Sequence, residues 1–367
     1  MRTTDIFVVG GGPAGLATAI AARQRGFDVV LADGARPPID KPCGEGLMPD
    51  SCAVLAKLGI DLQSQNSRPF RSVRFVSGNL SVQAPFPGHP GIGVRRTVLH
   101  RLLIEKAEAA GVCLLWQTPV TGTGSESIMA GGQTVRSRWI VGADGGHSRV
   151  RHWAGLEDYR CNRNRFAFRR HYRIASCDDV MEIHWGPKCQ LYLTPLSEGE
   201  ICVAAVSSDP KLRLDAAVQK FPEVAMRLKH AEPTSQEKGA ISSTRKLRRV
   251  QKGNIALVGD ASGAVDCITG EGLCLSFRQA EILAECFADG SLRGYEKKHR
   301  SLSMRPAMMA RLMLALDWSI PLRRRVMRAF ESDPRLFRHM LAMHVGALSP
   351  MEFAANGFSL GFRMLIA

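Results

Sequence analysis

Three glycines and one acid near the start of the chain are spaced to hold a dinucleotide. Gly10, Gly12 and Gly15 follow the G-x-G-x-x-G pattern. The first glycine permits a tight turn, the second lets the backbone approach a pyrophosphate, and the third lets a helix pack against the preceding strand. Asp33 follows at close to the roughly 20-residue separation at which a carboxylate binds a ribose hydroxyl. The pattern therefore predicts a dinucleotide whose pyrophosphate lies at a helix N-terminus.

The segments around these residues have the composition of a strand, a helix and a second strand. Residues 6–9 form a short, fully apolar run, which is typical of a buried parallel strand. Residues 16–25 are rich in alanine and predict a helix that ends at Gly26. Residues 29–32 predict the next strand, which leads directly into Asp33. The motif thus has the strand–turn–helix–strand context that its function requires.

Composition bounds the partners of the chain. It has 367 residues, of which 45% are hydrophobic, and a formal net charge of +15. The length is sufficient for one large core or two interlocked domains. The basic balance favours an anionic cofactor or an anionic lipid surface. It does not favour nucleic acid, because the sequence has neither zinc-finger spacing nor a basic strand motif with interleaved aromatic residues.

The distribution of cysteines and the hydropathy of the chain predict its cellular compartment. Ten cysteines are scattered without a C-x-x-C pair, which predicts reduced thiols in a cytoplasmic protein. The first predicted strand begins too early for a signal peptide, and no apolar run reaches the roughly 18 residues of a membrane span. Because histidines and carboxylates do not cluster at ligand spacing, we predict no metal site.

Two further glycine–aspartate turns organise the rest of the chain. Gly142–Gly145 follows a predicted strand at 134–141, and Gly259-Asp260 follows an apolar strand at 255–258. Between these turns, residues 166–207 alternate as antiparallel strands do, and residues 211–229 predict a helix. We therefore favour one nucleotide domain built from discontinuous segments around an inserted sheet. The alternative is a βαβ domain followed by unrelated modules.

The predicted fold class is α/β, with three regions. The Rossmann-like domain comprises residues 1–70, 91–160 and 250–290, the β-sheet substrate domain comprises residues 71–90 and 161–249, and a helical C-terminal region comprises residues 291–367. Further helices are predicted at 50–58, 95–110, from 272 past 283, and from 295 onward.

Four segments together resemble the superfamily of flavoprotein hydroxylases and geranylgeranyl reductases, whose fold is that of para-hydroxybenzoate hydroxylase. They are Gly10–Gly15 with Asp33; Arg96, or its neighbour Arg95, before a helix with Leu99 and Leu103; Gly142–Gly145 with Ser148 and Arg151; and residues 259–272. The resemblance covers about residues 1–300, with Asp33 standing where most relatives carry Glu. It implies a GR2-type FAD-binding domain with an inserted antiparallel sheet.

The third glycine–aspartate turn is the most informative about the flavin. Asp260 stands at a strand end, where its carboxylate can accept hydrogen bonds from ribityl hydroxyls. Gly270 and Gly272 open a helix whose N-terminus favours the negative charge of reduced flavin. The full set of predicted FAD-binding residues is Gly10, Gly12, Pro13, Ala14, Gly15, Asp33, Lys41, Cys43, Gly44, Arg95, Arg96, Val120, Asp144, Gly259, Asp260, Gly270, Gly272 and Leu273.

The sequence contains few candidate catalytic side chains. The resemblance places the loop of residues 41–49 over the far face of the flavin, where Glu45 could orient substrate or accept a proton, unless it is simply a surface acid. Tyr192 is the other candidate, as a proton donor in a reductase. For Cys43 we favour an inert packed thiol over a reactive one. His147 and His171 are predicted to be structural.

Sequence features divide between two flavin reactions. The segment 259–263 lacks the histidine of hydroxylases, and residues 266–272 resemble the reductase branch. Residues 190–195, however, resemble monooxygenases of lipophilic or polyketide-like substrates. We therefore predict hydroxylation of a lipophilic or aromatic compound through a flavin C4a-hydroperoxide with O2. The alternatives are reduction or dehydrogenation of C=C bonds in an isoprenoid or lipid, and then halogenation or flavin binding without catalysis.

Two further partners remain open in the sequence. Only one dinucleotide fingerprint is complete, so electrons come either from NAD(P)H bound transiently or from a separate reductase. The tail at 295–345 alternates methionines and leucines with arginines, among them Arg323, Arg324 and Arg325. Such basic amphipathic helices predict peripheral contact with an anionic membrane, against the alternative that they pack on the flavin domain. The oligomeric state is not predicted.

Overall fold

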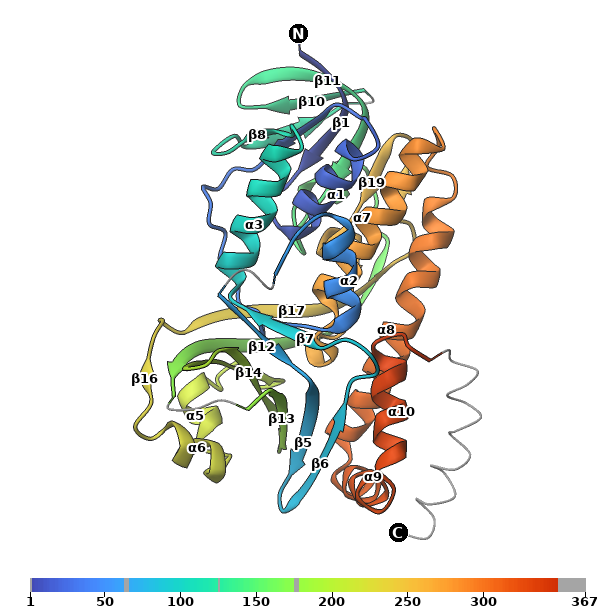
Figure 1. The fold of residues 1–367 in the computed structure, drawn as a ribbon. Coiled ribbons are helices and arrows are strands. Elements are labelled where there is room, and N and C mark those ends of the chain that lie inside the picture. Colours follow the sequence, from blue (N-terminus) through green and yellow to red (C-terminus); the bar gives the residue numbers. More distant parts are fainter. Residues whose placement is uncertain (1, 63–65, 125, 175–177, 349–367) are drawn as a thin grey trace.

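Two β-sheets, one above the other in Figure 1, carry most of the secondary structure. The computed structural model describes residues 2–62, 66–124, 126–174 and 178–348. The upper sheet has the order β18-β19-β11-β1-β2-β8, with β10 and β9 continuing from β11. Its strands are β1 (Arg2–Val9), β2 (Val29–Ala32), β8 (Cys113–Leu115), β9 (Val120–Thr123), β10 (Ser127–Ala130), β11 (Gln133–Gly142), β18 (Gln251–Lys252) and β19 (Ile255–Leu257).

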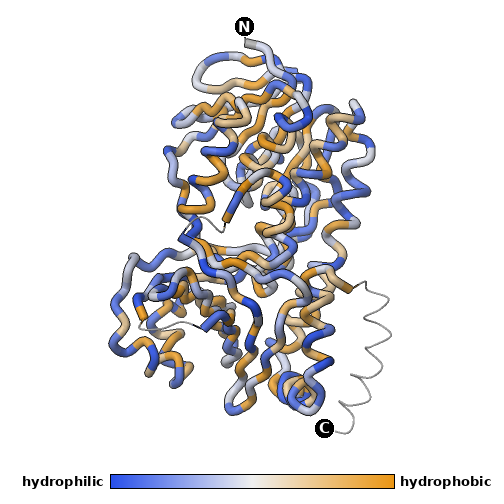
Figure 2. Tube along the Cα trace, in the orientation of Figure 1, coloured by the Kyte–Doolittle hydropathy of each residue, from blue (hydrophilic) through white to orange (hydrophobic). Residues whose placement is uncertain are grey.

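The centre of the upper sheet joins segments that are far apart in sequence. β1 pairs in parallel with β2 on one side and with β11 on the other, and β11 pairs in parallel with β19. The stretches 6–9, 29–32, 139–141 and 255–257 of these strands are apolar, as suits a sheet covered on both faces, and Figure 2 shows a hydrophobic centre there. The helices that accompany this sheet are α1 (Pro13–Arg23), α2 (Pro49–Lys57), α3 (Arg96–Ala109), α4 (Arg149–Trp153) and α7 (Gly272–Ala288). The α/β architecture predicted from sequence is confirmed.

The lower sheet has the order β20-β17-β12-β15-β14-β13-β5-β6, with β16 pairing to β12. Its pairings are antiparallel except that β13 and β5 run parallel, and β5 forms an antiparallel hairpin with β6. The strands are β5 (Ser72–Ser77), β6 (Leu80–Pro85), β12 (Tyr159–Arg173), β13 (Val180–Gly186), β14 (Cys189–Ser197), β15 (Glu200–Ser207), β16 (Glu232–Pro233), β17 (Lys238–Leu247) and β20 (Gly263–Ala264). A small third sheet, with the order β3 (Gly46–Leu47), β7 (Gly91–Val94) and β4 (Ser67–Phe70), lies between the two.

The two faces of the lower sheet have different neighbours. Leu191, Leu193 and Val203 face α5 (Leu214–Val218) and α6 (Pro222–Leu228), with which they form one hydrophobic cluster. The sequence predicted one helix over residues 211–229. The structure has two, because a proline without an N–H starts the second helix at its first turn. The opposite face of the sheet is turned toward the C-terminal helices, with which it shares a second hydrophobic cluster.

Three C-terminal helices pack on the free edge of the lower sheet. They are α8 (Tyr295–Trp318), α9 (Ile320–Ser332) and α10 (Pro334–His344), and they bury Met309, Met313 and Met327 against the β5–β6 hairpin. Arg323 is also buried, and its guanidinium donates to the Leu316 carbonyl and to Ser77. Arg323 is therefore part of the packing of these helices and is not available to a membrane surface. Residues 349–367 of the predicted helical region lie outside the described residues.

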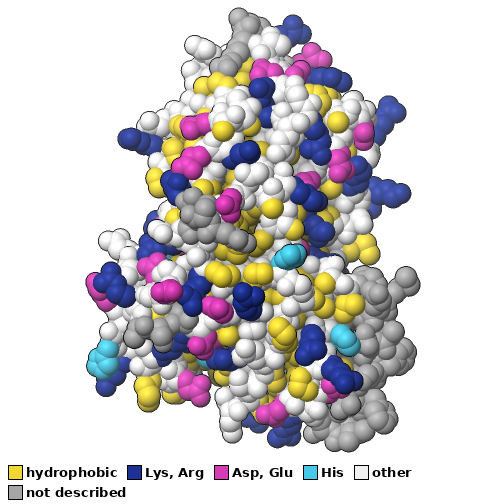
Figure 3. Space-filling model, in the orientation of Figure 1, with side chains coloured by type: hydrophobic (Ala, Val, Ile, Leu, Met, Phe, Trp, Pro, Cys, Tyr) yellow, Lys and Arg dark blue, Asp and Glu magenta, His cyan; other side chains and the backbone are white. Residues whose placement is uncertain are grey.

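The surface charge is spread rather than gathered on the face in view. Figure 3 shows Lys and Arg interspersed with Asp and Glu over both halves of the molecule. Among the described residues, no helix is both long and apolar enough to cross a membrane.

Candidate active site

The glycines of the first turn differ in what surrounds them. A Cβ at Gly10, whose φ is +109°, would collide with the carbonyl oxygen of Ala143, and one at Gly15 would collide with that of Gly10. A Cβ at Gly12 would meet nothing within 4 Å. Gly10 and Gly15 are therefore required for close packing, while Gly12 leaves the backbone open to a ligand, as the motif predicts. Pro13 opens α1 and is buried, whereas Ala14 is half-buried.

The three glycine–aspartate turns meet because their strands are neighbours. Val9 is opposite Gly142, and Gly142 is opposite Leu257, so the turns that follow β1, β11 and β19 leave the same edge of the sheet. Ligands of open parallel sheets bind at the carboxyl ends of the strands. This edge is therefore the place for a dinucleotide.

The aspartates of these turns have different environments. Asp33 accepts hydrogen bonds from the backbone of Gly11 at 2.6 Å and Ala35 at 2.7 Å, so it also fixes the turn. One oxygen of Asp144 accepts from the first N–H groups of α4, and its other oxygen is buried without a hydrogen-bond partner among the described residues. Asp260 is exposed at the strand end. The ammonium of Lys41 lies 3.2 Å from the place of a Cβ on Gly145, and so reaches the second turn.

His100 is a residue of this site that the sequence did not reveal. It lies on α3 and is fully buried. Its Nε2 donates to the Gly11 carbonyl at 2.7 Å, and its Nδ1 accepts from the Ile39 N–H at 3.2 Å. Burial lowers the pKa of His100, which keeps the ring in this neutral form. A lone histidine in a helix gives no pattern, so only the tertiary structure shows that it ties the glycine turn to the following loop.

An open strip of backbone continues from the turn toward the lower sheet. A Cβ at Gly44, Gly270 or Gly272 would meet nothing within 4 Å, and Gly270 has a φ of +69°. A flat ring therefore has room against this backbone, and these glycines fit FAD. Val120 begins β9, but its side chain belongs to a hydrophobic cluster, so only its backbone is available to a cofactor.

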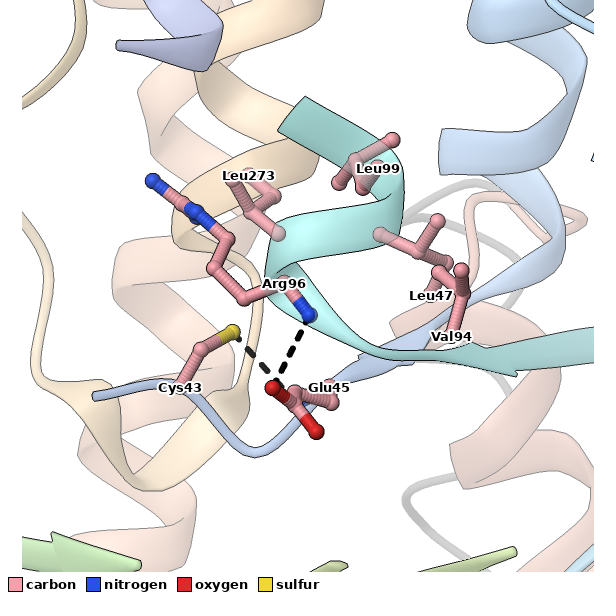
Figure 4. Close-up of a pocket in the computed structure, with 7 residues that line it drawn as sticks. All are labelled: Cys43, Glu45, Leu47, Val94, Arg96, Leu99 and Leu273. Carbon is pink, nitrogen blue, oxygen red and sulfur yellow. Dashed lines mark hydrogen bonds between the residues drawn. The ribbon is translucent and has the colours of Figure 1, made fainter. Parts of the chain in front are cut away.

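A small pocket lies beside this strip, and Figure 4 shows its lining. The lining residues are Cys43, Glu45, Leu47, Val94, Arg96, Leu99 and Leu273. Arg96 extends beside Leu273, and its Nε has no hydrogen-bond partner among the described residues. Arg95, by contrast, is paired with Glu200, whose hydrogen bond raises the pKa of the guanidinium. Of the two neighbouring arginines, Arg96 therefore lines the pocket, and its contact with the cofactor stays a prediction.

Glu45 is the acid of the pocket lining, and both of its carboxylate oxygens make polar contacts. It is buried, with a φ of +58°, and its Oε1 accepts from the backbone N–H of Arg96 at 2.9 Å. Its Oε2 lies 2.6 Å from Nε2 of His171, and the Arg169 guanidinium is 3.7 Å away. The other ring nitrogen of His171 lies 2.8 Å from the hydroxyl of Ser235. Because His171 and Arg169 alternate along β12, both face the pocket side of the sheet.

Two thiols lie beside this pair. Burial raises the pKa of Cys43 and that of Cys202, so both remain protonated thiols at neutral pH, as predicted for an inert Cys43. Glu45, His171 and Cys202 nevertheless bring one ligand atom each within 4.8 Å of one another, although the sequence predicted no metal site. The nearby Arg169 guanidinium opposes a cation, and the 2.6 Å contact between Glu45 and His171 is that of a hydrogen-bonded pair.

The segment before Gly270 is held by side chains of the lower sheet. Tyr192 donates its hydroxyl to the Ile268 carbonyl at 2.8 Å, and burial raises its pKa well above the usual value. Arg165 is buried between Asp266 and Asp317, with Nη2 2.9 Å from the latter. Tyr192 therefore positions the loop that precedes α7. Its role as a proton donor stays a prediction.

The fold and the glycine-lined site define a dinucleotide-binding flavoprotein. The family model described as "FAD binding domain" matches residues 3–301, and the chain belongs to this family. Its cofactor is therefore FAD, and the chain is an FAD-dependent oxidoreductase of the superfamily expected from sequence.

Relatives of known name cover most of the chain. A menaquinone reductase of Mycobacterium tuberculosis is 27% identical over 77% of this chain and 76% of its own. A chloroplastic geranylgeranyl diphosphate reductase of Oryza sativa is 28% identical over 80% of this chain and 68% of its own. A flavoprotein/dehydrogenase structure from Cytophaga hutchinsonii superimposes with a TM-score of 0.82 at 20% identity, covering 94% of this chain and 93% of its own, which shows the fold alone.

Proposed function

We propose that this protein uses FAD to reduce C=C bonds in a lipophilic, isoprenoid-type substrate. The observation that carries the proposal is the buried Glu45–His171 pair beside the pocket. Reduction of an alkene adds a hydride to one carbon and a proton to its neighbour. Bound FAD supplies the hydride, so the protein must supply the proton, and this pair can hold one.

The surrounding residues have distinct roles in this proposal. Glu45 holds the proton between its Oε2 and Nε2 of His171, and the N–H of Arg96 fixes the carboxylate. After transfer, a new proton reaches the pair through His171 and the half-buried hydroxyl of Ser235. Leu47, Val94 and Leu99 contribute apolar side chains that exclude water from the reacting carbons.

Sequence similarity supports reduction over hydroxylation. Two relatives that match three quarters or more of the chain are named as reductases. Hydroxylation, which the sequence analysis placed first, transfers oxygen from the cofactor to the substrate. That reaction does not require a buried proton donor beside the substrate. It remains the competing outcome of the test below.

The test is the identity of the product. The purified protein with FAD is reduced by dithionite without oxygen and mixed with menaquinone or geranylgeranyl diphosphate, and the product is analysed by mass spectrometry. We expect a product that has gained two hydrogen atoms for each flavin oxidised. In a parallel reaction in air with NAD(P)H in place of dithionite, oxygen consumption that depends on substrate, with a product one oxygen atom heavier, would instead establish a monooxygenase.

The electron donor follows as a separate proposal. Either NAD(P)H binds transiently or another protein supplies electrons. Loss of the oxidised flavin absorbance on mixing with NADH or NADPH supports the first. An unchanged spectrum, followed by reduction when a purified reductase is added, supports the second.

We also propose that the junction of α8 and α9 rests on an anionic membrane. Trp318 is 57% and Ile320 is 44% exposed there, and Arg324 and Arg325 are exposed on the next turn. Apolar side chains flanked by cations are suited to a lipid interface. The variant W318S/I320S should sediment less with phosphatidylserine vesicles than the wild type, whereas M226S, at an exposed methionine on α6, should not differ. Equal sedimentation of all three proteins would refute the contact.

A further inference from the structure

A buried acid stands between two glycines that are open to the cofactor. Gly270 and Gly272 are exposed with nothing near a Cβ position, whereas Glu271 between them is 3% exposed. Its side chain lies among α2, α8 and α10, where it meets Asp50, Arg305 and His344. The backbone of this turn thus faces the flavin position while its carboxyl group belongs to the interior.

Glu271 is poorly partnered for a buried carboxyl group. Its Oε1 lies 3.4 Å from Nη2 of Arg305, and its Oε2 lies 3.7 Å from Nδ1 of His344. Neither contact is a hydrogen bond, and both oxygens and that Nδ1 have no hydrogen-bond partner among the described residues. The same Nη2 of Arg305 donates to Asp50 at 2.9 Å. The Arg305 guanidinium is therefore engaged mainly by Asp50.

Burial makes Glu271 a titrating group near neutral pH, and the neighbouring charges modify this effect. Burial raises its pKa to about 8, against the opposing effect of Arg305 and Arg278, and Asp50 raises it further. Burial lowers the pKa of His344 to about 4, so this histidine is neutral. The groups that surround the carboxyl are Asp50 on α2, Cys274 and Arg278 on α7, Arg305 on α8 and His344 on α10.

We propose that Glu271 takes up a proton from solvent when the FAD at the N-terminus of α7 is reduced, and thereby sets how the flavin potential depends on pH. Two electrons and one proton leave a reduced flavin with one negative charge, which lies against the backbone N–H groups of this turn. A carboxylate in the same turn is a like charge in a buried site, so the reduced flavin favours the protonated acid. One O–H bond forms on Glu271, the proton comes from water, and the electrons come from the external reductant.

The coupling is reciprocal by linkage. An ionised Glu271 makes reduction of the flavin harder, and a protonated one makes it easier. This inference requires bound FAD, but it does not depend on alkene reduction or on any substrate. Its failure is therefore distinguishable from failure of the proposed function.

The experiment measures the midpoint potential of the holoprotein by dithionite titration against reference dyes from about pH 6 to about pH 10. For a two-electron couple, one proton corresponds to about 30 mV per tenfold change in proton concentration. We expect the wild type to steepen from about 30 to about 60 mV per pH unit above about pH 8, and E271Q to keep the shallower slope throughout. Parallel lines for the two proteins would overturn the proposal.

A control variant and a second measurement check this result. E285Q removes an exposed acid of the same helix, paired with Lys298 at 2.9 Å, and should keep the wild-type break. Proton uptake is also measured directly on the wild type, with a pH-indicator dye in weak buffer during photoreduction. We expect one proton per flavin below the break and about two above it. A single proton at every pH would refute the proposal even if E271Q does not fold.

Discussion

Two buried Glu–His pairs lie against the lower sheet, one on each of its faces. Glu45 and His171 are 2.6 Å apart beside the pocket, and Glu182 and His184 are 2.7 Å apart on the face covered by α6. Burial raises the pKa of Glu182, but the hydrogen bond from His184 and the Arg227 guanidinium outweigh it and lower the pKa to about 2. Glu182 is therefore an anion stabilised by the Arg227 guanidinium.

The difference lies in what else each pair touches. Glu182 is 2.9 Å from Arg227, which comes from α6. Glu45 accepts a hydrogen bond from a backbone N–H, has the Arg169 guanidinium at 3.7 Å, and borders the pocket. A short Glu–His contact is therefore not by itself evidence of catalysis. The position of the pair relative to the cofactor decides its role.

The strongest way to break this comparison is to remove the ionisable group from each pair. E45Q should lower turnover of the reduced product by about 10²–10⁴-fold, because a general acid contributes an effect of that size. Flavin absorbance and circular dichroism should be unchanged. E182Q, the matched control, should stay within about threefold once its folding is verified. An E45Q enzyme with wild-type turnover would remove Glu45 from the chemistry.

A third glutamate sharpens the comparison, because Glu271 has neither kind of partner. Its pKa in the folded chain is raised from 4.5 to about 8, so the stability it contributes is complete below pH 4.5 and is lost as pH rises through about 8. E271Q does not titrate and should gain on the wild type by up to about 1.4 kcal/mol per pH unit in that window, on the order of 5 kcal/mol in total. Urea unfolding of the apoprotein at several pH values measures this. A constant difference between the proteins would contradict it.

Glu182 should show the opposite pH dependence. Because its pKa is lowered from 4.5 to about 2, its contribution is present above pH 4.5 and is lost as pH falls through about 2. E182Q should therefore unfold with a free energy lower by about 3 kcal/mol at neutral pH, and the difference should vanish in acid. Chemical denaturation followed by circular dichroism tests both the size and the sign.

His100 offers the smallest effect, since its partners are backbone groups rather than an acid. H100F leaves the Gly11 carbonyl and the Ile39 N–H unpaired, which should cost about 2 kcal/mol of stability and weaken FAD binding. Turnover at saturating FAD should be nearly unchanged. The control is H147A, at an exposed histidine, which should match the wild type in melting temperature and in FAD affinity measured by fluorescence.

Part of this protein was readable from local pattern alone. The turn at Gly10–Gly15, the apolar strands and the recurrence of glycine–aspartate turns predicted the FAD fold, because backbone freedom and strand burial are properties of short segments. The same locality explains an error. Helical periodicity over residues 211–229 was read as one helix, whereas Pro222 begins a second.

What the sequence determined by itself is the cofactor and the edge of the sheet that receives it, since three glycine turns suffice for that. Only the tertiary structure decided that Arg96 rather than Arg95 faces the pocket, that His171 meets Glu45, and that Glu271 is enclosed by α8 and α10. These pairings join residues separated by long stretches of chain. They depend on strand register and helix packing, and a one-residue change in either would replace each partner with its neighbour.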